Sequence, residues 1–356
     1  MTDWPDRRIL DLFGIEHAVL LAPMAGFGTP ELAIAVAEAG GLGALACATI
    51  TPEQARAALD RIRAATAKPI NLNFFCHRPP EDDPQREAGW RARLSPYYRE
   101  LGLDPSMAVA PSSRAPFDDV YCEMVEAYRP EVVSFHFGLP ERRLLDRVKA
   151  TGAKVISSAT TVAEARHLEA EGCDAIIAQG AEAGGHRGMF LTADVSGQIG
   201  TFSLVPQVVD AVRVPVIAAG GIADARGVVA ALALGASAVQ IGTAFLLSPE
   251  ARISPQHRRA LETAEADETA ITNVFTGRPA RGVVNRLMRE LGRFSADAPA
   301  FPLAAGALAP LRAETEPLGS RDFMPLWSGQ SARLARSMPA GDLVRSLAAE
   351  VLAKIG

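Results

Sequence analysis

The sequence predicts an α/β fold: a (β/α)8 TIM barrel with a lid-like insertion and a C-terminal helical extension. Eight short apolar runs recur between residues 18 and 241, and a helix-like segment follows each run. This rhythm indicates a parallel sheet, because parallel neighbours need crossover connections. A doubly wound open sheet is the competing architecture, and it would usually carry a dinucleotide fingerprint after its first strand. Here Gly26-Phe27-Gly28 supplies two glycines, but Glu31 stands where the third belongs.

The apolar runs predict strands because they are short, continuous and bounded by residues that favour turns. The expected strands are 18–22, 42–47, 68–75, 132–137, 154–158, 174–179, 216–219 and 238–241. Thr29-Pro30 and Thr51-Pro52 predict helix starts, since threonine caps free N–H groups and proline is tolerated in a first turn. Further barrel helices are expected at 117–128, 140–151, 162–171, 204–212 and 223–234.

Two regions depart from this alternation of strands and helices. Residues 76–116 are rich in proline and too long for an ordinary connection, which predicts a lid or excursion over a site. Residues 251–356 carry probable helices at 260–270, 280–291 and 342–355. We therefore expect a cofactor-binding barrel in 1–250, with its insertion at about 76–116, and a helical extension in 251–356 that packs on the barrel and caps the site.

Composition excludes several classes of function. The chain has 356 residues and a net charge of −5, which argues against a nucleic acid or an anionic membrane as partner. The four cysteines are far apart, so neither a zinc site nor a disulfide framework is expected, and reduced thiols fit a cytoplasmic enzyme. There is no apolar stretch typical of a signal peptide or a transmembrane helix. No metal site is expected, because no His-x-His motif or carboxylate cluster ends a strand.

The segment 178–188 is the clearest candidate for chemistry. It follows an expected strand and packs four glycines around His186. Glycines let the main chain approach a ligand closely, and histidine can gain or lose a proton near neutral pH. This pattern indicates a catalytic base beside a flat or phosphorylated ligand, although a flexible loop with an incidental histidine gives the same pattern.

Other strand ends point to the same rim, where the active sites of such barrels lie. Glycines follow the last two strands, in Gly220-Gly221 and Gly242-Thr243, and suit a phosphate. Amide side chains with both donors and acceptors can read the edge of a polar ring; these are Asn71, Gln179 and Gln240, with Asn73 beside the first. Together with the apolar Met24 after Pro23, they suggest flavin mononucleotide (FMN).

The remaining histidines are less informative. His136 lies in an apolar run, so it is either a hydrogen-bonded core residue or, at the strand end, a contact to flavin or substrate. His17, His77, His167 and His257 are expected at the surface.

Several of these segments resemble the nitronate monooxygenase family, formerly called 2-nitropropane dioxygenase. The matching motifs are Leu21-Ala22-Pro23-Met24-Ala25-Gly26, Asn71-Leu72-Asn73-Phe74-Phe75, Ser134-Phe135-His136-Phe137-Gly138, the segment 179–188, Ala219-Gly220-Gly221-Ile222, Gln240-Ile241-Gly242-Thr243 and Pro325-Leu326-Trp327-Ser328-Gly329-Gln330. The Glu-Ala-Gly-Gly-His part of 179–188 is also shared by flavin-dependent enoyl-acyl-carrier-protein reductases.

The resemblance implies an FMN-bound barrel that oxidises alkyl nitronates, such as propionate 3-nitronate or nitroalkane anions, with O2 to a carbonyl compound and nitrite. It implies that His186 is the catalytic base. The flavin contacts are then expected at Pro23, Met24, Asn71, Gln179, Gly184, Gly185, Gly220, Gly221, Gln240, Ile241, Gly242 and Thr243. Either a monomer or a homodimer is compatible with it.

Alternatives remain at this stage. The main one is a flavin-dependent enoyl-thioester reductase that uses NAD(P)H, and another is a non-catalytic protein that binds flavin or phosphate. The insertion matches the family only loosely. The resemblance therefore does not indicate which tyrosine, if any, lines the pocket; the candidates are Tyr97, Tyr98, Tyr121 and Tyr128.

Overall fold

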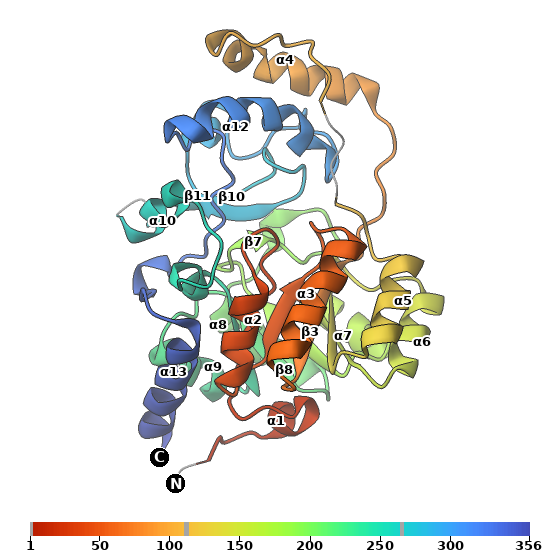
Figure 1. Ribbon diagram of the computed structural model, residues 1–356, viewed down its shortest axis with the longest axis vertical. Coiled ribbons are helices and arrows are strands. Elements are labelled where there is room, and N and C mark those ends of the chain that lie inside the picture. Colours follow the sequence, from red (N-terminus) through yellow and green to blue (C-terminus); the bar gives the residue numbers. More distant parts are fainter. Residues whose placement is uncertain (1–2, 110–113, 264–266) are drawn as a thin grey trace.

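A closed barrel of eight parallel strands forms the centre of the protein. The computed structural model describes residues 3–109, 114–263 and 267–356 (Figure 1). The strands follow the order β1-β9-β8-β6-β5-β4-β3-β2 around the sheet, and a parallel bridge from Leu20 to Leu42 joins its first and last members. Their bounds are β1 Val19–Leu21, β2 Gly43–Ala46, β3 Ile70–Phe75, β4 Val132–His136, β5 Lys154–Ala159, β6 Ala175–Gln179, β8 Val216–Ala219 and β9 Ala238–Ile241. The predicted barrel is thereby confirmed.

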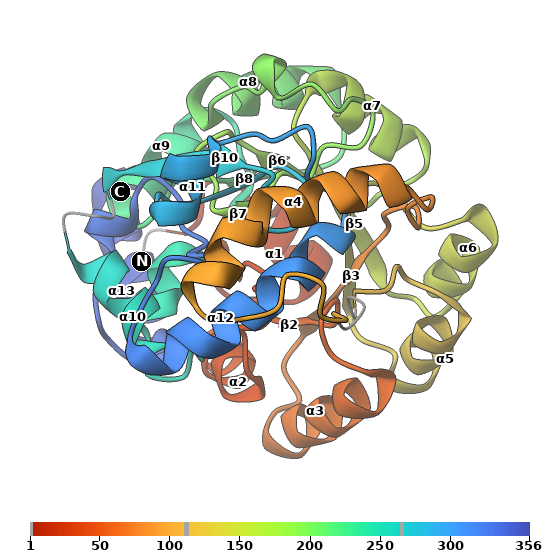
Figure 2. The same cartoon turned by 90° about the horizontal axis from the view of Figure 1, so that it is seen from above.

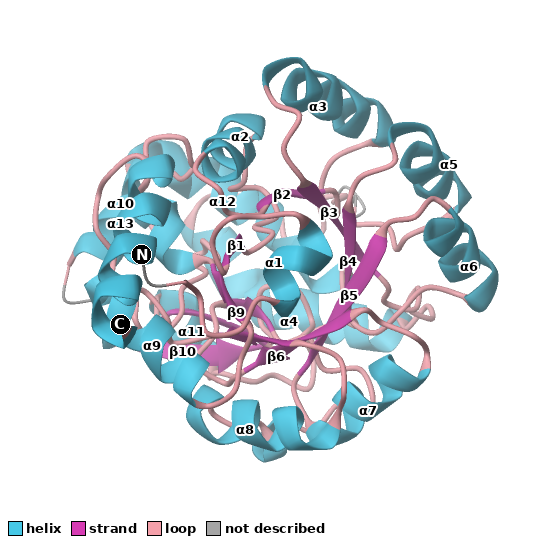
Figure 3. Ribbon diagram, turned by 90° about the horizontal axis from the view of Figure 1, so that it is seen from below, coloured by secondary structure: helices cyan, strands magenta, loops and turns pink. Residues whose placement is uncertain are grey.

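Helices surround this barrel, as the view from below shows (Figure 3). Both faces of the strands are covered, which explains why the strands read as continuous apolar runs. The surrounding helices are α2 Pro30–Glu38, α3 Pro52–Ala65, α5 Asp119–Tyr128, α6 Arg142–Ala150, α7 Val162–Ala170, α8 Thr201–Ala211 and α9 Ala225–Ala233. The threonine caps were predicted correctly: the hydroxyls of Thr29 and Thr51 accept from the main-chain N–H groups of Leu32 and Gln54.

The two ends of the chain complete the barrel. Helix α13, Ala340–Ile355, packs between α9 and α2, so the eighth position of the helical ring is filled from the C-terminus rather than by a helix directly after β9. The segment after β9 is the short 3-10 helix η2, Thr243–Leu247. Helix α1, Arg8–Phe13, buries Ile9, Leu10 and Phe13 at the lower end of the barrel.

The insertion and the extension share a second hydrophobic core above the barrel (Figure 2). The insertion contains a long helix, α4 Pro84–Glu100, which packs on the 3-10 helix η4, Leu303–Leu308, beside α12, Ala309–Thr315. Trp90 of α4 is fully buried and its Nε1 donates to the carbonyl of Ala304 at 3.1 Å. The insertion therefore folds against the extension as part of one layer over the strand ends.

The extension is not entirely helical, contrary to the sequence prediction. Instead of helices over 260–270 and 280–291, it has α10 Pro255–Glu262, β10 Thr269–Thr272, β11 Ala280–Val283 and α11 Arg286–Leu291; residues 264–266 lie outside the described part of the chain. Strand β11 pairs antiparallel with both β10 and the two-residue strand β7, Gly185–His186. Hydrogen bonds from a distant part of the chain decide this conformation, which local apolar spacing cannot reveal.

No described helix combines the length and the hydropathy that crossing a bilayer requires.

Candidate active site

A pocket opens at the carboxyl ends of the barrel strands, beneath the layer formed by the insertion and the extension. It brings together most residues that the sequence singled out: Pro23, Met24, His136, Gln179, Gly184, Gly185, His186, Gly220, Gly221, Gln240, Gly242 and Thr243. Two predicted residues, Asn71 and Ile241, are buried in the strands and do not line it. Asn73, two residues further along β3 than Asn71, lines the pocket in that region, so Asn71 lies one step deeper in the barrel.

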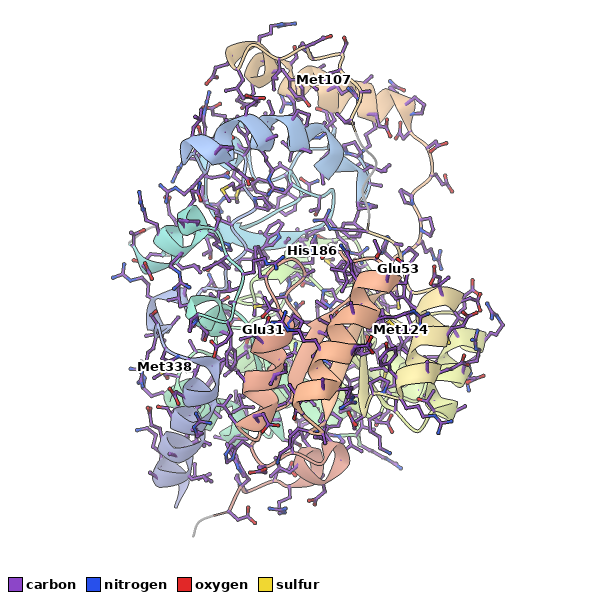
Figure 4. The ribbon with its side chains drawn as sticks, viewed as in Figure 1. Glu31, Glu53, Met107, Met124, His186 and Met338 are labelled. Carbon is purple, nitrogen blue, oxygen red and sulfur yellow. The ribbon has the colours of Figure 1, made fainter. Side chains whose placement is uncertain are left out.

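His186 lies where the barrel meets the upper layer (Figure 4). Its main chain pairs with Ala280 of β11, and its Nε2 lies 2.9 Å from the hydroxyl oxygen of Thr276. Its ring packs among aromatic rings, with centroid distances of 5.3 Å to Phe301 and 5.5 Å to Trp327. The extension therefore fixes the orientation of an imidazole that the barrel loop delivers.

The electrostatic surroundings keep His186 neutral. Burial is the main cause that lowers the pKa of its imidazole well below 6.5, and the nearby Arg114, His136, Arg278 and His77 lower it further. An uncharged imidazole has a free lone pair at neutral pH, so this residue can accept a proton.

The loop that carries His186 is held by buried polar side chains. The guanidinium of Arg187 is fully buried and donates to the carbonyls of Gln179 and Gly180, each at 2.7 Å. The Gln179 side chain bridges the loop, since its Nε2 donates to the carbonyl of His186 at 3.0 Å and its Oε1 accepts from the N–H of Gly188 at 2.7 Å. Gln179 thus borders the pocket while both ends of its amide hold the loop.

His136 supports the same carbonyl from the neighbouring strand. Its Nε2 lies 3.2 Å from the carbonyl oxygen of His186, and its Nδ1 lies 3.1 Å from the hydroxyl of Ser158. A carbonyl only accepts, so Nε2 carries the proton and Nδ1 accepts from Ser158. Burial lowers the pKa of His136 to about 3, which keeps the ring neutral. His136 therefore combines the two alternatives left open, a hydrogen-bonded core position and a place in the pocket wall.

Two histidines expected at the surface are buried. His77 is 5% exposed and His257 is 1% exposed. The Nε2 of His257 lies 3.1 Å from the carbonyl oxygen of Trp327, and its ring packs at 5.2 Å on Phe27. The upper layer covers both residues, and nothing in the local sequence indicates that cover.

Glycines line much of the pocket wall. Gly221 has a φ of 72°, in the left-handed region that favours glycine. A Cβ on Gly184 would lie 2.5 Å from the main-chain nitrogen of Gly329, so only glycine fits between this loop and the extension. Gly329 also donates to the hydroxyl of Thr243 at 2.9 Å. The extension thus packs against the loops that carry these glycines.

The polar and apolar groups that line this pocket fit a flavin mononucleotide. The side-chain oxygen of Gln240, which lines the pocket, is buried and has no hydrogen-bond partner among the described residues; the same holds for Asn71, which lies one step deeper in the barrel and outside the lining. Buried polar atoms are rarely left unpaired, so a polar group of a ligand is expected to meet them. The glycines leave room for a phosphate near the main chain, and Met24 offers an apolar contact for a ring. Within the described chain, no group of three or more His, Cys, Asp or Glu side chains could hold a metal ion.

Some pocket residues escaped the sequence analysis. Arg114, from the end of the insertion, lines the pocket, and Thr276, from the connection between β10 and β11, contacts His186. Both come from segments without a strand pattern, so no sequence signal marked them. The four tyrosines that were left open do not line this pocket; Tyr97 and Tyr98 belong to the second core instead.

Comparisons with known proteins agree with this arrangement. The family model described as nitronate monooxygenase matches residues 6–350. The chain is similar to a nitronate monooxygenase of Pseudomonas aeruginosa, with 42% identity over 99% of both chains, and to a probable nitronate monooxygenase of Staphylococcus aureus, with 36% identity over 97% of both. A crystal structure of nitroalkane oxidase from Streptomyces ansochromogenes superposes with a TM-score of 0.86, at 39% identity over 97% of both chains. FabK from Thermotoga maritima superposes with a TM-score of 0.72, at 30% identity over 98% of this chain and 96% of the other. The chain therefore belongs to the nitronate monooxygenase family, a family of oxidoreductases.

Proposed function

We propose that this enzyme oxidises alkyl nitronates with O2 to a carbonyl compound and nitrite, using FMN. The observation that carries the proposal is the neutral His186 at the wall of a pocket that is also lined by Gln240, with its unpaired amide oxygen, and by several glycines. The nitroalkane oxidase of similar structure supports the choice of nitro compounds as substrate class.

The chain would hold the cofactor by its ring and by its phosphate. Gln240 has a free amide oxygen for the polar edge of the ring, and Gly221 with Thr243 would lie at the phosphate. When bound, FMN supplies the electron transfer and the reaction with O2, whereas the protein supplies orientation and electrostatics.

The substrate would lie between this cofactor and His186. A nitronate carries a negative charge, and Arg114 places a cation in the wall of the same pocket. A neutral nitroalkane must first lose a proton, which the neutral imidazole of His186 can accept. Phe75 and Trp327 line the pocket with apolar surface that limits water. We propose that α4 and the extension act together as the cover of this site.

Anaerobic mixing of the FMN-loaded protein with a preformed nitronate, and separately with NADH or NADPH, tests the proposal. Loss of the oxidised flavin absorbance with the nitronate alone is expected. Protein that cannot take up FMN would refute the cofactor assignment.

A flavin-dependent reductase that uses NAD(P)H is the second candidate, because FabK has a similar fold at 30% identity. Rapid loss of flavin absorbance with NAD(P)H, and none with the nitronate, would favour the reductase and overturn the proposal of nitronate oxidation.

A further inference from the structure

A second cavity lies beside the first, where the insertion, the segment after β7 and the connection between β10 and β11 meet. Its lining is basic, with His77, Arg78, Arg86 and Arg278, and no carboxylate is among the lining residues. The ring of Phe301, which packs at 4.8 Å on His77 and at 5.3 Å on His186, separates it from the first pocket. The cavity is therefore a neighbour of the candidate active site and has walls of its own.

The positive charge of this cavity is not neutralised by ion pairs. Among the described residues, no carboxylate forms an ion pair with Arg78, Arg86 or Arg278. The Nε atoms of Arg86 and Arg278 are buried and find no hydrogen-bond partner in the described part of the chain. Glu164 acts on Arg278 through its charge, but both of its carboxylate oxygens accept other donors, including the N–H of Phe190 at 2.7 Å. The cavity thus holds buried donors and no matching acceptor.

His77 provides an independent observation. Its side chain is 5% exposed and borders the cavity, yet its Nδ1 has no hydrogen-bond partner among the described residues. Its position is fixed by the rings of Phe301 and Phe137, at 4.8 Å and 6.4 Å, and by a hydrogen bond to the main chain of Arg114. Three residues from separate segments, His77, Arg86 and Arg278, therefore line one cavity, and each has an unpaired side-chain nitrogen.

We propose that this cavity binds an oxyanion, the phosphate or carboxylate group of a small ligand, between Arg86 and Arg278 and beside the neutral His77. Guanidinium groups bind such anions through charge-assisted hydrogen bonds, and neither Arg86 nor Arg278 has a carboxylate partner among the described residues. Arg278 is preorganised for this role, because its Cζ lies 3.9 Å above the ring of Phe137 and its guanidinium donates to the carbonyl of Met189. The inference does not depend on the reaction proposed for the first pocket.

Calorimetric titration of the FMN-loaded protein with inorganic phosphate and with succinate tests this site. Loading with FMN fills the phosphate end of the first pocket, and the comparison of Arg86 and Arg99 variants assigns the remaining heat to the second cavity. We expect saturable binding of at least one anion. The tighter of the two identifies the ligand class as phosphate-bearing or carboxylate-bearing.

The variant Arg86→Gln should weaken this binding by about tenfold, because a charge-assisted hydrogen bond is lost. Arg99→Gln is the matched control, since Arg99 is an exposed residue in the last turn of the same helix and its loss changes the net charge equally. Equal affinities of these two variants, or no saturable heat with either anion, would overturn the proposal. Neither substitution touches the first pocket, so their comparison remains decisive even if the protein takes up no FMN.

Discussion

Replacing His186 by asparagine should lower the activity on neutral nitroalkanes far more than the activity on preformed nitronates. His186→Asn removes the titratable nitrogen at the pocket wall while keeping a polar side chain near Thr276. We expect the variant to bind FMN and to lose most activity on neutral nitroalkanes. Preformed nitronates have already lost the proton, so activity on them should fall much less.

The size of the effect follows from the surroundings of the imidazole. The pKa of His186 lies well below 6.5, chiefly through burial, so nearly every molecule carries the free base at neutral pH. A positioned general base contributes about 10²–10⁴ in rate, which corresponds to about 3–5 kcal/mol of activation free energy. We therefore expect a loss of that size on nitroalkanes and of less than about tenfold on nitronates, where only packing changes.

Steady-state rates with a nitroalkane and with its preformed nitronate, measured side by side, provide the assay. In the unsubstituted enzyme, activity on the nitroalkane should persist below pH 6.5 and decline only as the pH falls through the lowered pKa of His186. His167→Asn, an exposed histidine on α7, is the control and should leave both rates unchanged. An equal loss on both substrates would contradict a role of His186 as base.

Three further predictions concern cofactor binding and stability. Gly221→Val should give protein without FMN, because φ is 72° there and a Cβ would lie 3.3 Å from a neighbouring side chain; Gly152→Val, with φ of 91° and open space around it, controls for backbone strain. A yellow Gly221→Val protein would refute the placement of the phosphate. Trp90→Ala should lower the free energy of unfolding by about 3–5 kcal/mol in urea titrations, since Trp90 is 1% exposed and joins the insertion to the extension; a change below about 1 kcal/mol would mean that the insertion is not part of that core. Burial lowers the pKa of His136 to about 3 and of His257 to about 4, so the unfolded chain binds more protons below pH 6.5 and stability should fall as the pH drops from there, by up to about 1.4 kcal/mol per pH unit for each histidine. Equal unfolding free energies at neutral pH and one unit below pH 6.5 would contradict the burial of these rings.

The barrel could be predicted from sequence because its signals are local. A parallel strand buried on both faces must be apolar along its whole length, and β8 and β9 have the predicted bounds. The crossover helices begin at capping threonines such as Thr29 and Thr51, which a reader can recognise without tertiary structure. Since the carboxyl ends of all barrel strands meet at one rim, most residues that the sequence singled out line one pocket.

The upper layer could not be predicted in the same way. The segment 280–291 has apolar spacing that suits a helix, but β11 forms its first part because hydrogen bonds to β10 and to Gly185–His186 decide its conformation. One of these partners, β7, lies about a hundred residues away, beyond the reach of any local pattern.

The sequence by itself therefore determined the barrel, the glycine-rich rim and the identity of His186 as the candidate base. Only the tertiary structure decided the setting of that histidine. Thr276, Arg114, Phe301 and Trp327 around it come from the insertion and the extension. The physical reason is that burial and neighbouring charge set the pKa of an imidazole, and both depend on which distant segments fold over it.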